Sequence, residues 1–215
     1  MKIGLIVAMD KEYAQLQPVA AASTKHELIL QKCGIGKVNA AIGAVEMIRD
    51  HQPDLIVSTG CAGGADTRLQ VGDVVAGIEY VYHDAYCGTA CAFGQILDLP
   101  ARFRAPDELV AKAMGMRSSG EGGRLFNGLM VSGDWFVDSR EKMRDILGHF
   151  PEALAVDMES CAIAQTCHRY GVPFLSFRII SDVPLSDHKA AQYFDFWARM
   201  ADGSFQVTSS FLESL

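Results

Sequence analysis

Five short clusters of polar, acidic or glycine residues each follow an apolar run of this sequence. They are Ala8-Met9-Asp10-Lys11-Glu12, Thr59-Gly60-Cys61-Ala62-Gly63-Gly64, Ser132-Gly133-Asp134-Trp135-Phe136, Asp157-Met158-Glu159 and Ser181-Asp182-Val183. Most of them contain carboxylates, which can transfer protons or accept hydrogen bonds from hydroxyl groups. The clusters therefore predict acid/base chemistry or hydroxyl binding more than the binding of an anion.

Two glycine-rich segments can bring the backbone close to a ligand. Gly34 and Gly36 open a predicted helix, and Gly60, Gly63 and Gly64 follow a predicted strand. Neither segment has the G-x-G-x-x-G spacing of dinucleotide-binding proteins, and the P-loop lysine signature is absent. A dinucleotide or ATP site is therefore disfavoured, and simple tight turns remain an alternative explanation of these glycines.

Cysteine usage gives little support to a metal site. The six cysteines lie in apolar or glycine-rich surroundings, and we expect them to be reduced. His83, Cys87 and Cys91 could share one face of a helix, but glycine and alanine interrupt this segment and a closed zinc site needs four ligands. We expect no metal and no cofactor.

Composition and charge exclude several classes of protein. Hydrophobic residues make up 49% of the chain and charged residues 21%, which is typical of a globular protein. The formal net charge is -7 and no basic run is present, so nucleic acid is not an expected partner. No stretch has the roughly 18 apolar residues that cross a membrane, and the segment MKIGLIVAMDKE predicts a first strand rather than a signal peptide. We expect a cytoplasmic protein.

Strand-like apolar runs alternate with segments of helical spacing. Strands are predicted at residues 2–8, 27–31, 54–59, 73–82, 125–132, 153–156 and 173–180, and helices at 11–22, 37–50, 106–116, 139–147, 159–170 and after His188. This alternation, without a linker, predicts one α/β domain over residues 1–215, with a mixed, largely parallel sheet and helices on both faces. Ligands of such sheets bind beyond the carboxyl ends of the strands, where the polar clusters lie. The long loop from Asp84 to Pro106 is expected to line a site or to reach a partner subunit.

Several segments together resemble one family. GLIVAMDKE, GIGKVNAA, LIVSTGCAGG, VGDVV, YHDA, GLMVSGDWF, AVDMESCAIAQ and FRIISDV are similar to segments of the 5′-methylthioadenosine/S-adenosylhomocysteine nucleosidases of the purine nucleoside phosphorylase superfamily, occur in the same order and cover nearly the whole chain. The resemblance implies a twisted mixed β-sheet surrounded by helices, a homodimer, and hydrolysis of a small nucleoside without a cofactor.

The resemblance also implies a role for particular residues. Glu12 matches the carboxylate that activates water, with Arg178 close to that water, and Asp182 matches the acid that protonates adenine N7, oriented by Ser181. The other matched positions bind substrate: Glu159 and Met158 at the ribose hydroxyls, Phe136 stacked on adenine, Val137 at the base edge through its backbone, and Met9 and Ile35 near the ribose and the 5′-thio group. Such an arrangement suits a bond that breaks through an oxocarbenium-like state, because positive charge develops on the sugar and negative charge on the purine.

Three of these residues also have a plainer interpretation. Glu12 could only complement a helix dipole, Asp182 could cap a helix, and Phe136 could belong to the core. Arg178 lies within an apolar strand, where a buried charge needs a partner.

Some positions depart from the family pattern. Cys61 stands where the family commonly has serine, Asp157 stands where it often has glutamate, and the region from Ala20 to Lys32 is shorter than expected. Phe93 is a candidate for an apolar residue that a partner subunit supplies. These departures leave the preferred 5′ group open.

Three other functions compete with this hypothesis. A phosphorylase of the same superfamily would need phosphate, which a carboxylate at position 12 would repel. A related nucleosidase acting on another nucleoside, such as futalosine, is poorly discriminated by the sequence. A nucleoside sensor without activity would not need Glu12, Glu159 and Asp182 together.

Overall fold

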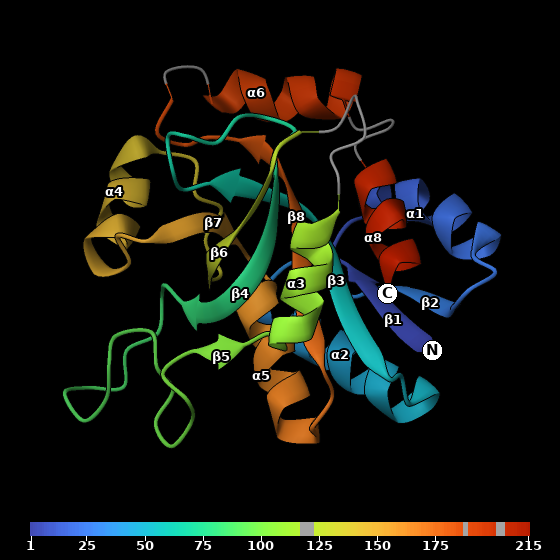
Figure 1. The fold of residues 1–215 in the computed structure, drawn as a ribbon. Helices are drawn as coiled ribbons and strands as arrows, with labels where there is room; N and C mark the ends of the chain where they lie inside the picture. The colour runs from blue at the N-terminus through green and yellow to red at the C-terminus, as the bar shows by residue number, and fades with distance from the viewer. Residues whose placement is uncertain (117–122, 187–188, 201–204) are drawn as a thin grey trace.

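The computed structural model describes residues 1–116, 123–186, 189–200 and 205–215, which form an α/β fold around one mixed sheet (Figure 1). Its strands are β1 Lys2–Val7, β2 Glu27–Lys32, β3 Leu55–Gly64, β4 Val74–Tyr82, β5 Phe103–Arg104, β6 Leu125–Ser132, β7 Ala153–Asp157 and β8 Phe174–Asp182. The predicted fold class, an α/β protein with a mixed sheet, is confirmed.

The sheet curls into a ring of strands with short extensions. Its order is β2-β1-β3-β7-β6-β4-β5, and β8 pairs with both β3 and β4. The β8 pairing is parallel to β3 and antiparallel to β4, so the ring runs from β3 through β7, β6, β4 and β8 back to β3. Strand β8 is therefore enclosed, and all nine of its residues are buried. This burial explains why its sequence is apolar without alternation.

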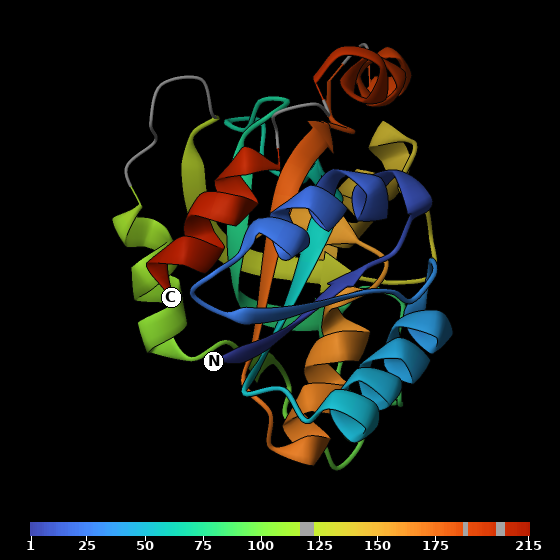
Figure 2. The ribbon, with the colours of Figure 1, turned by 90° about the vertical axis from the view of Figure 1, so that its right-hand side faces the viewer.

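Helices surround the sheet. They are α1 Asp10–Ala22, α2 Lys37–His51, α3 Asp107–Gly115, α4 Arg140–His149, α5 Ser160–Tyr170, α6 Lys189–Asp195, a π-helix Phe196–Met200 and α8 Gln206–Ser214. Helices α2 and α5 lie side by side, and α8 lies next to α3 and α1 (Figures 1 and 2). In both views α6 lies beyond the carboxyl end of β8.

Three differences separate the predicted elements from the observed ones. The prediction that the strand ends at residue 59 is wrong, because β3 continues through the glycine-rich cluster to Gly64 and pairs there with β7 and β8. Strand β5 lies inside the predicted loop from Asp84 to Pro106, where it pairs with β4. The predicted C-terminal helical stretch after His188 contains two α-helices and a π-helix, while residues 187–188 and 201–204 lie outside the described residues. No helix within the described ranges is long and apolar enough to cross a membrane.

Candidate functional site

A pocket opens where the ends of several strands converge. Its residues surround about 650 Å³ of empty space, part of which is open to solvent. The lining residues are Ala8, Met9, Glu12, Ile35, Cys61, Ala62, Gly63, Trp135, Phe136, Val137, Val156, Asp157, Met158, Glu159, Ser181, Asp182 and Tyr193. All of the predicted site residues except Arg178 are among them.

Glu12 is held rigidly in the first turn of α1. Its side chain is 1% exposed and turns back to accept hydrogen bonds from the backbone N–H groups of Ala8 at 3.0 Å and Met9 at 3.1 Å. The other carboxylate oxygen accepts from Cys61 N at 2.9 Å on β3. Burial raises the pKa of Glu12, although Arg178 and these donors oppose the rise. The Glu12 side chain therefore does more than complement the dipole of α1, because it also joins α1 to β3 at the pocket.

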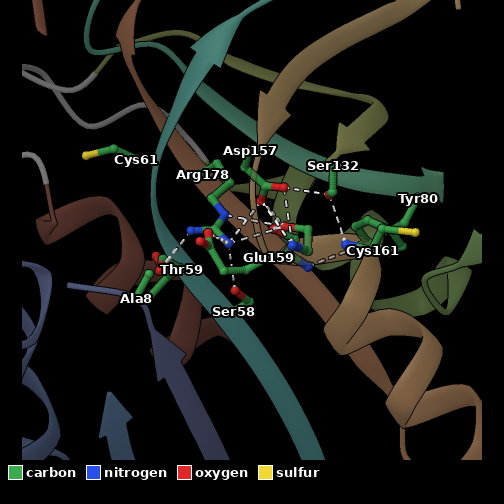
Figure 3. Close-up of polar contacts among 12 residues, drawn as sticks. Ala8, Ser58, Thr59, Cys61, Tyr80, Ser132, Asp157, Glu159, Cys161 and Arg178 are labelled. Atoms are coloured by element: carbon green, nitrogen blue, oxygen red, sulfur yellow. Dashed lines mark hydrogen bonds and ion pairs between the residues drawn. The ribbon is translucent and has the colours of Figure 1, made fainter. Parts of the chain in front are cut away.

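Arg178 lies behind the pocket, in the middle of β8. Its Nη2 contacts Asp157 Oδ2 at 3.0 Å and Glu159 Oε2 at 3.6 Å, and it donates to Ser58 Oγ at 2.9 Å (Figure 3). Burial disfavours its positive charge, but the neighbouring carboxylates outweigh that effect and raise the pKa of Arg178. The expectation that this buried charge has a partner is confirmed, whereas its closeness to an attacking water stays a prediction.

Glu159 joins the end of β7 to the loop before α2. One of its carboxylate oxygens accepts from Gly36 N at 3.0 Å, and the side chain lines the pocket next to Met158. Burial raises the pKa of Glu159 to about 7 and Asp157 adds to the rise, while Arg178 opposes it. Both protonation states of Glu159 are therefore accessible near neutral pH.

Asp182 is the last residue of β8 and faces the same pocket. Ser181 Oγ donates to Asp182 Oδ1 at 2.8 Å, and burial raises the pKa of Asp182 to about 6. The alternative that Asp182 caps a helix is wrong, because α6 begins only at Lys189. Asp182 combines a pocket position with a pKa that lets it hold a proton near neutral pH.

Apolar side chains form the open part of the pocket. Phe136 is 56% exposed, so the alternative that it belongs to the core is wrong. Its ring meets the edge of Tyr193 at a centroid distance of 5.5 Å. Tyr193 was not predicted from the sequence, although an aromatic residue in the C-terminal helical stretch is a weak signal for it. The Tyr193 hydroxyl also lies 4.0 Å from Met9 Sδ, so α6 closes one side of the pocket.

An ion pair and two hydrogen bonds join two loops that line the pocket. Lys37 Nζ contacts Asp84 Oδ2 at 2.8 Å, and Lys37 N donates to Asp134 Oδ1 at 2.7 Å. Asp134 N in turn donates to Asp84 Oδ2 at 2.8 Å. These contacts fix the loop that carries Ile35 relative to the loop that carries Phe136.

The segment considered for a metal has no helical structure. His83, Cys87 and Cys91 lie in the irregular stretch after β4. In the part of the chain that the structure describes, no group of three or more His, Cys, Asp or Glu side chains is placed to hold a metal ion.

Comparisons with known proteins agree with this architecture. The model of the phosphorylase superfamily matches residues 20–213. The 5′-methylthioadenosine/S-adenosylhomocysteine nucleosidase of Desulfotalea psychrophila is 37% identical, with 100% of this chain and 98% of the relative covered. The nucleosidase of the same name from Staphylococcus carnosus is 38% identical, with 99% and 100% covered. The fold and the carboxylate-lined pocket thus define an α/β protein of the phosphorylase superfamily.

Solved structures narrow this assignment. The crystal structure of 5′-methylthioadenosine/S-adenosylhomocysteine nucleosidase from Neisseria meningitidis, in complex with methylthio-immucillin-A, superimposes with a TM-score of 0.92 at 34% identity and covers 100% of this chain and 99% of that one. The chain belongs to the 5′-methylthioadenosine/S-adenosylhomocysteine nucleosidase family. The family assignment made from the sequence motifs is confirmed.

Proposed function

We propose that the protein hydrolyses the bond between adenine and ribose in 5′-methylthioadenosine or S-adenosylhomocysteine, releasing adenine and a 5-thio-substituted ribose. The observation that carries this proposal is the convergence of Glu12, Glu159 and Asp182 on one pocket, where burial raises the pKa of each carboxylate. Glu159 and Asp182, with pKa values of about 7 and about 6, can exchange protons near neutral pH, as an acid/base reaction requires.

Asp182 is suited to act as the general acid. With a pKa of about 6, roughly a tenth of its carboxyl groups carries a proton at pH 7, far more than at the ordinary pKa of 3.8. Transfer of that proton to adenine N7 neutralises the negative charge that builds on the departing purine. The hydrogen bond from Ser181 restricts the rotation of the carboxyl group, which supports an orienting role for Ser181.

Glu12 is suited to act as the general base. Three backbone N–H groups hold its two carboxylate oxygens, so the side chain is oriented before any substrate binds. We assign to Glu12 the role of accepting a proton from the attacking water. We assign to Arg178 the role of balancing the negative charge of Glu12 and Glu159.

The remaining pocket residues are suited to bind the nucleoside. Ionised Glu159 can accept hydrogen bonds from two ribose hydroxyls, and exposed Phe136 offers a face for adenine. Val137 is assigned to the base edge, and Met9, Ile35 and Met158 to the sugar and its 5′ group. Cys61, which also lines the pocket, adds a neutral thiol because burial raises its pKa.

Water is favoured over phosphate as the nucleophile. Within the described residues, the pocket lining contains no lysine or arginine to balance a phosphate dianion. Arg178 already has carboxylate partners, and Lys37 is paired with Asp84. Adding phosphate next to Glu12 would therefore concentrate negative charge in a buried site.

The decisive experiment is incubation of the purified protein with methylthioadenosine in phosphate-free buffer, followed by separation of the products. We expect free adenine and a reducing 5-thio-sugar, with no increase in turnover when phosphate is added. Turnover that requires phosphate and yields a ribose 1-phosphate would replace the hydrolase by a phosphorylase.

We further propose a single-domain, cytoplasmic homodimer. Val38 and Ile42 form an apolar stripe on α2 that begins at pocket residue Ile35, and the three side chains are 69%, 52% and 50% exposed. A second copy over this stripe would shield one edge of the pocket. Phe93 stacks on His149 of its own chain at a centroid distance of 3.8 Å. That a partner subunit contributes its Phe93 to the pocket stays a prediction.

A further inference from the structure

Asp157 lies at the centre of a buried hydrogen-bond network next to the pocket. Asp157 Oδ1 accepts from Ser132 Oγ at 2.6 Å, and Oδ2 accepts from Ser160 Oγ. Both carboxylate oxygens also lie within 3.3 Å of Ser160 N. Asp157 is thus surrounded by donors in addition to its ion pair with Arg178 (Figure 3).

The serine hydroxyls around Asp157 are hydrogen-bonded in turn to other buried groups. Ser160 Oγ accepts from Arg178 Nε at 3.4 Å and from Arg178 Nη2 at 3.3 Å, and it lies 2.7 Å from Ser176 Oγ, where either hydroxyl can be the donor. Ser132 Oγ is likewise used as an acceptor by Cys161 N and has its proton free for Asp157. Two serine hydroxyls and one backbone N–H group can thus donate to the Asp157 carboxyl group, in addition to its contact with Arg178.

Glu159 also contacts the Arg178 guanidinium, but at a longer distance than Asp157 does. Its contact with Arg178 Nη2 is 3.6 Å, against 3.0 Å for Asp157, and its backbone donor is Gly36 N. Glu159 faces Arg178 on β8, Asp157 on β7, Glu12 on α1 and the Cys33 thiol after β2. Burial raises the pKa of Cys33 to about 12, so this thiol adds no charge at neutral pH.

The charges around Arg178 do not balance if every carboxylate is ionised. Glu12, Asp157 and Glu159 would bring three negative charges against one positive charge in a buried region. Unbalanced buried charge is costly, and the usual response is protonation of the least stabilised acid. Glu12 has three backbone donors and Asp157 has its serine network, which leaves Glu159 as that acid.

We propose that Asp157 is a positioning residue, the partner that retains Arg178, and that Glu159 consequently carries a proton in a large part of the ligand-free protein near neutral pH. Glu159 then releases this proton to solvent when ribose hydroxyls donate hydrogen bonds to its carboxylate. The catalytic consequence rests on the proposed function, whereas the location of the proton in the free protein does not.

The test is a carbon NMR titration of the free protein labelled at the glutamate side-chain carboxyls. The Glu159 signal is assigned by its loss in Glu159→Gln. We expect a midpoint near 7 in the wild type. Asp157→Asn should lower it by about one unit or more, because Arg178 then turns to Glu159. Asp157→Glu, which keeps the charge, should return the midpoint toward the wild-type value.

A matched control removes another buried aspartate that pairs with an arginine. Asp73 lies 2.7 Å from Arg124 and does not line the pocket, so Asp73→Asn should leave the Glu159 midpoint unchanged. A wild-type midpoint near the ordinary value of 4.5 would overturn the proposal even if Asp157→Asn did not fold. An unmoved midpoint in folded Asp157→Asn would do so as well. Failure of hydrolysis alone would contradict the proposed function and leave this titration intact.

Discussion

Replacing Asp182 by asparagine is expected to make the folded protein more stable at neutral pH while slowing the reaction. Burial raises the pKa of Asp182 from its ordinary value of 3.8 to about 6. The folded protein therefore binds this proton more tightly than the unfolded chain, and stability falls as pH rises from about 4 to about 6. Above pH 6 the ionised carboxylate costs about 3 kcal/mol, at 1.36 kcal/mol for each unit of the pKa shift.

Asparagine removes this cost without changing the size of the side chain. Its amide oxygen can still accept from Ser181, so the local hydrogen bond is kept. The variant should therefore melt roughly 6 to 12 °C above the wild type at pH 7.5, and the difference should disappear near pH 4. Denaturant unfolding at the two pH values measures the same difference as a free energy of unfolding.

The same change should nearly abolish hydrolysis. An amide can donate a hydrogen bond to adenine N7 but cannot deliver a proton, so the chemical step should slow by about two to four orders of magnitude, or about 3 to 5 kcal/mol of barrier. Single-turnover rates are needed because product release can hide the chemistry. A folded variant that keeps more than about a tenth of the wild-type rate, or that is less stable than the wild type at pH 7.5, would refute the reasoning.

Three further outcomes are expected. Gly60→Ala should cost activity, because a Cβ there would meet the Glu12 carboxylate and lie 2.8 Å from Arg178 Nη1, and because φ is +141° at this position; circular dichroism separates this effect from unfolding. Glu159→Gln should weaken binding and rate more for a ribonucleoside than for its 2′-deoxy analogue, and steady-state kinetics giving equal losses would remove Glu159 from the ribose. Light scattering at micromolar concentration should return about twice the 23.3 kDa of one chain, and a monomer mass would contradict the dimer.

The sequence predicts the strands and the carboxylates at their ends well, for a physical reason. Buried parallel strands need apolar side chains on both faces, so polar residues such as Glu159 and Asp182 mark where the strands end. The fold class and the gathering of these residues in one pocket follow from that rule. Their chemical roles were inferred from family motifs and stay predictions.

Other features depend on contacts between distant parts of the chain. Tyr193 reaches the pocket only because α6 lies beyond the end of β8, and the helical pattern of its own segment does not indicate this placement. The continuation of β3 to Gly64 depends on pairing with β7 and β8, since glycines have little intrinsic tendency to form strands. The partners of Arg178 come from strands remote in sequence, so the sequence indicated that a partner was needed without identifying Asp157.

The carboxylates at the pocket outnumber the cations near them, and this imbalance affects both the stability of the fold and the proposed reaction. Desolvation raises the pKa of Glu12, Glu159 and Asp182, so each carboxylate makes the fold less stable once it ionises. Extra cations would relieve this cost, but they would also hold the carboxylates ionised and leave no proton for the purine. Arg178 lies behind the pocket and already pairs with Asp157. It therefore balances part of the buried negative charge and still leaves Asp182 able to hold a proton. The same imbalance repels anions such as phosphate and favours a sugar that becomes positively charged, which is the electrostatic requirement for hydrolysis of an N-glycosidic bond.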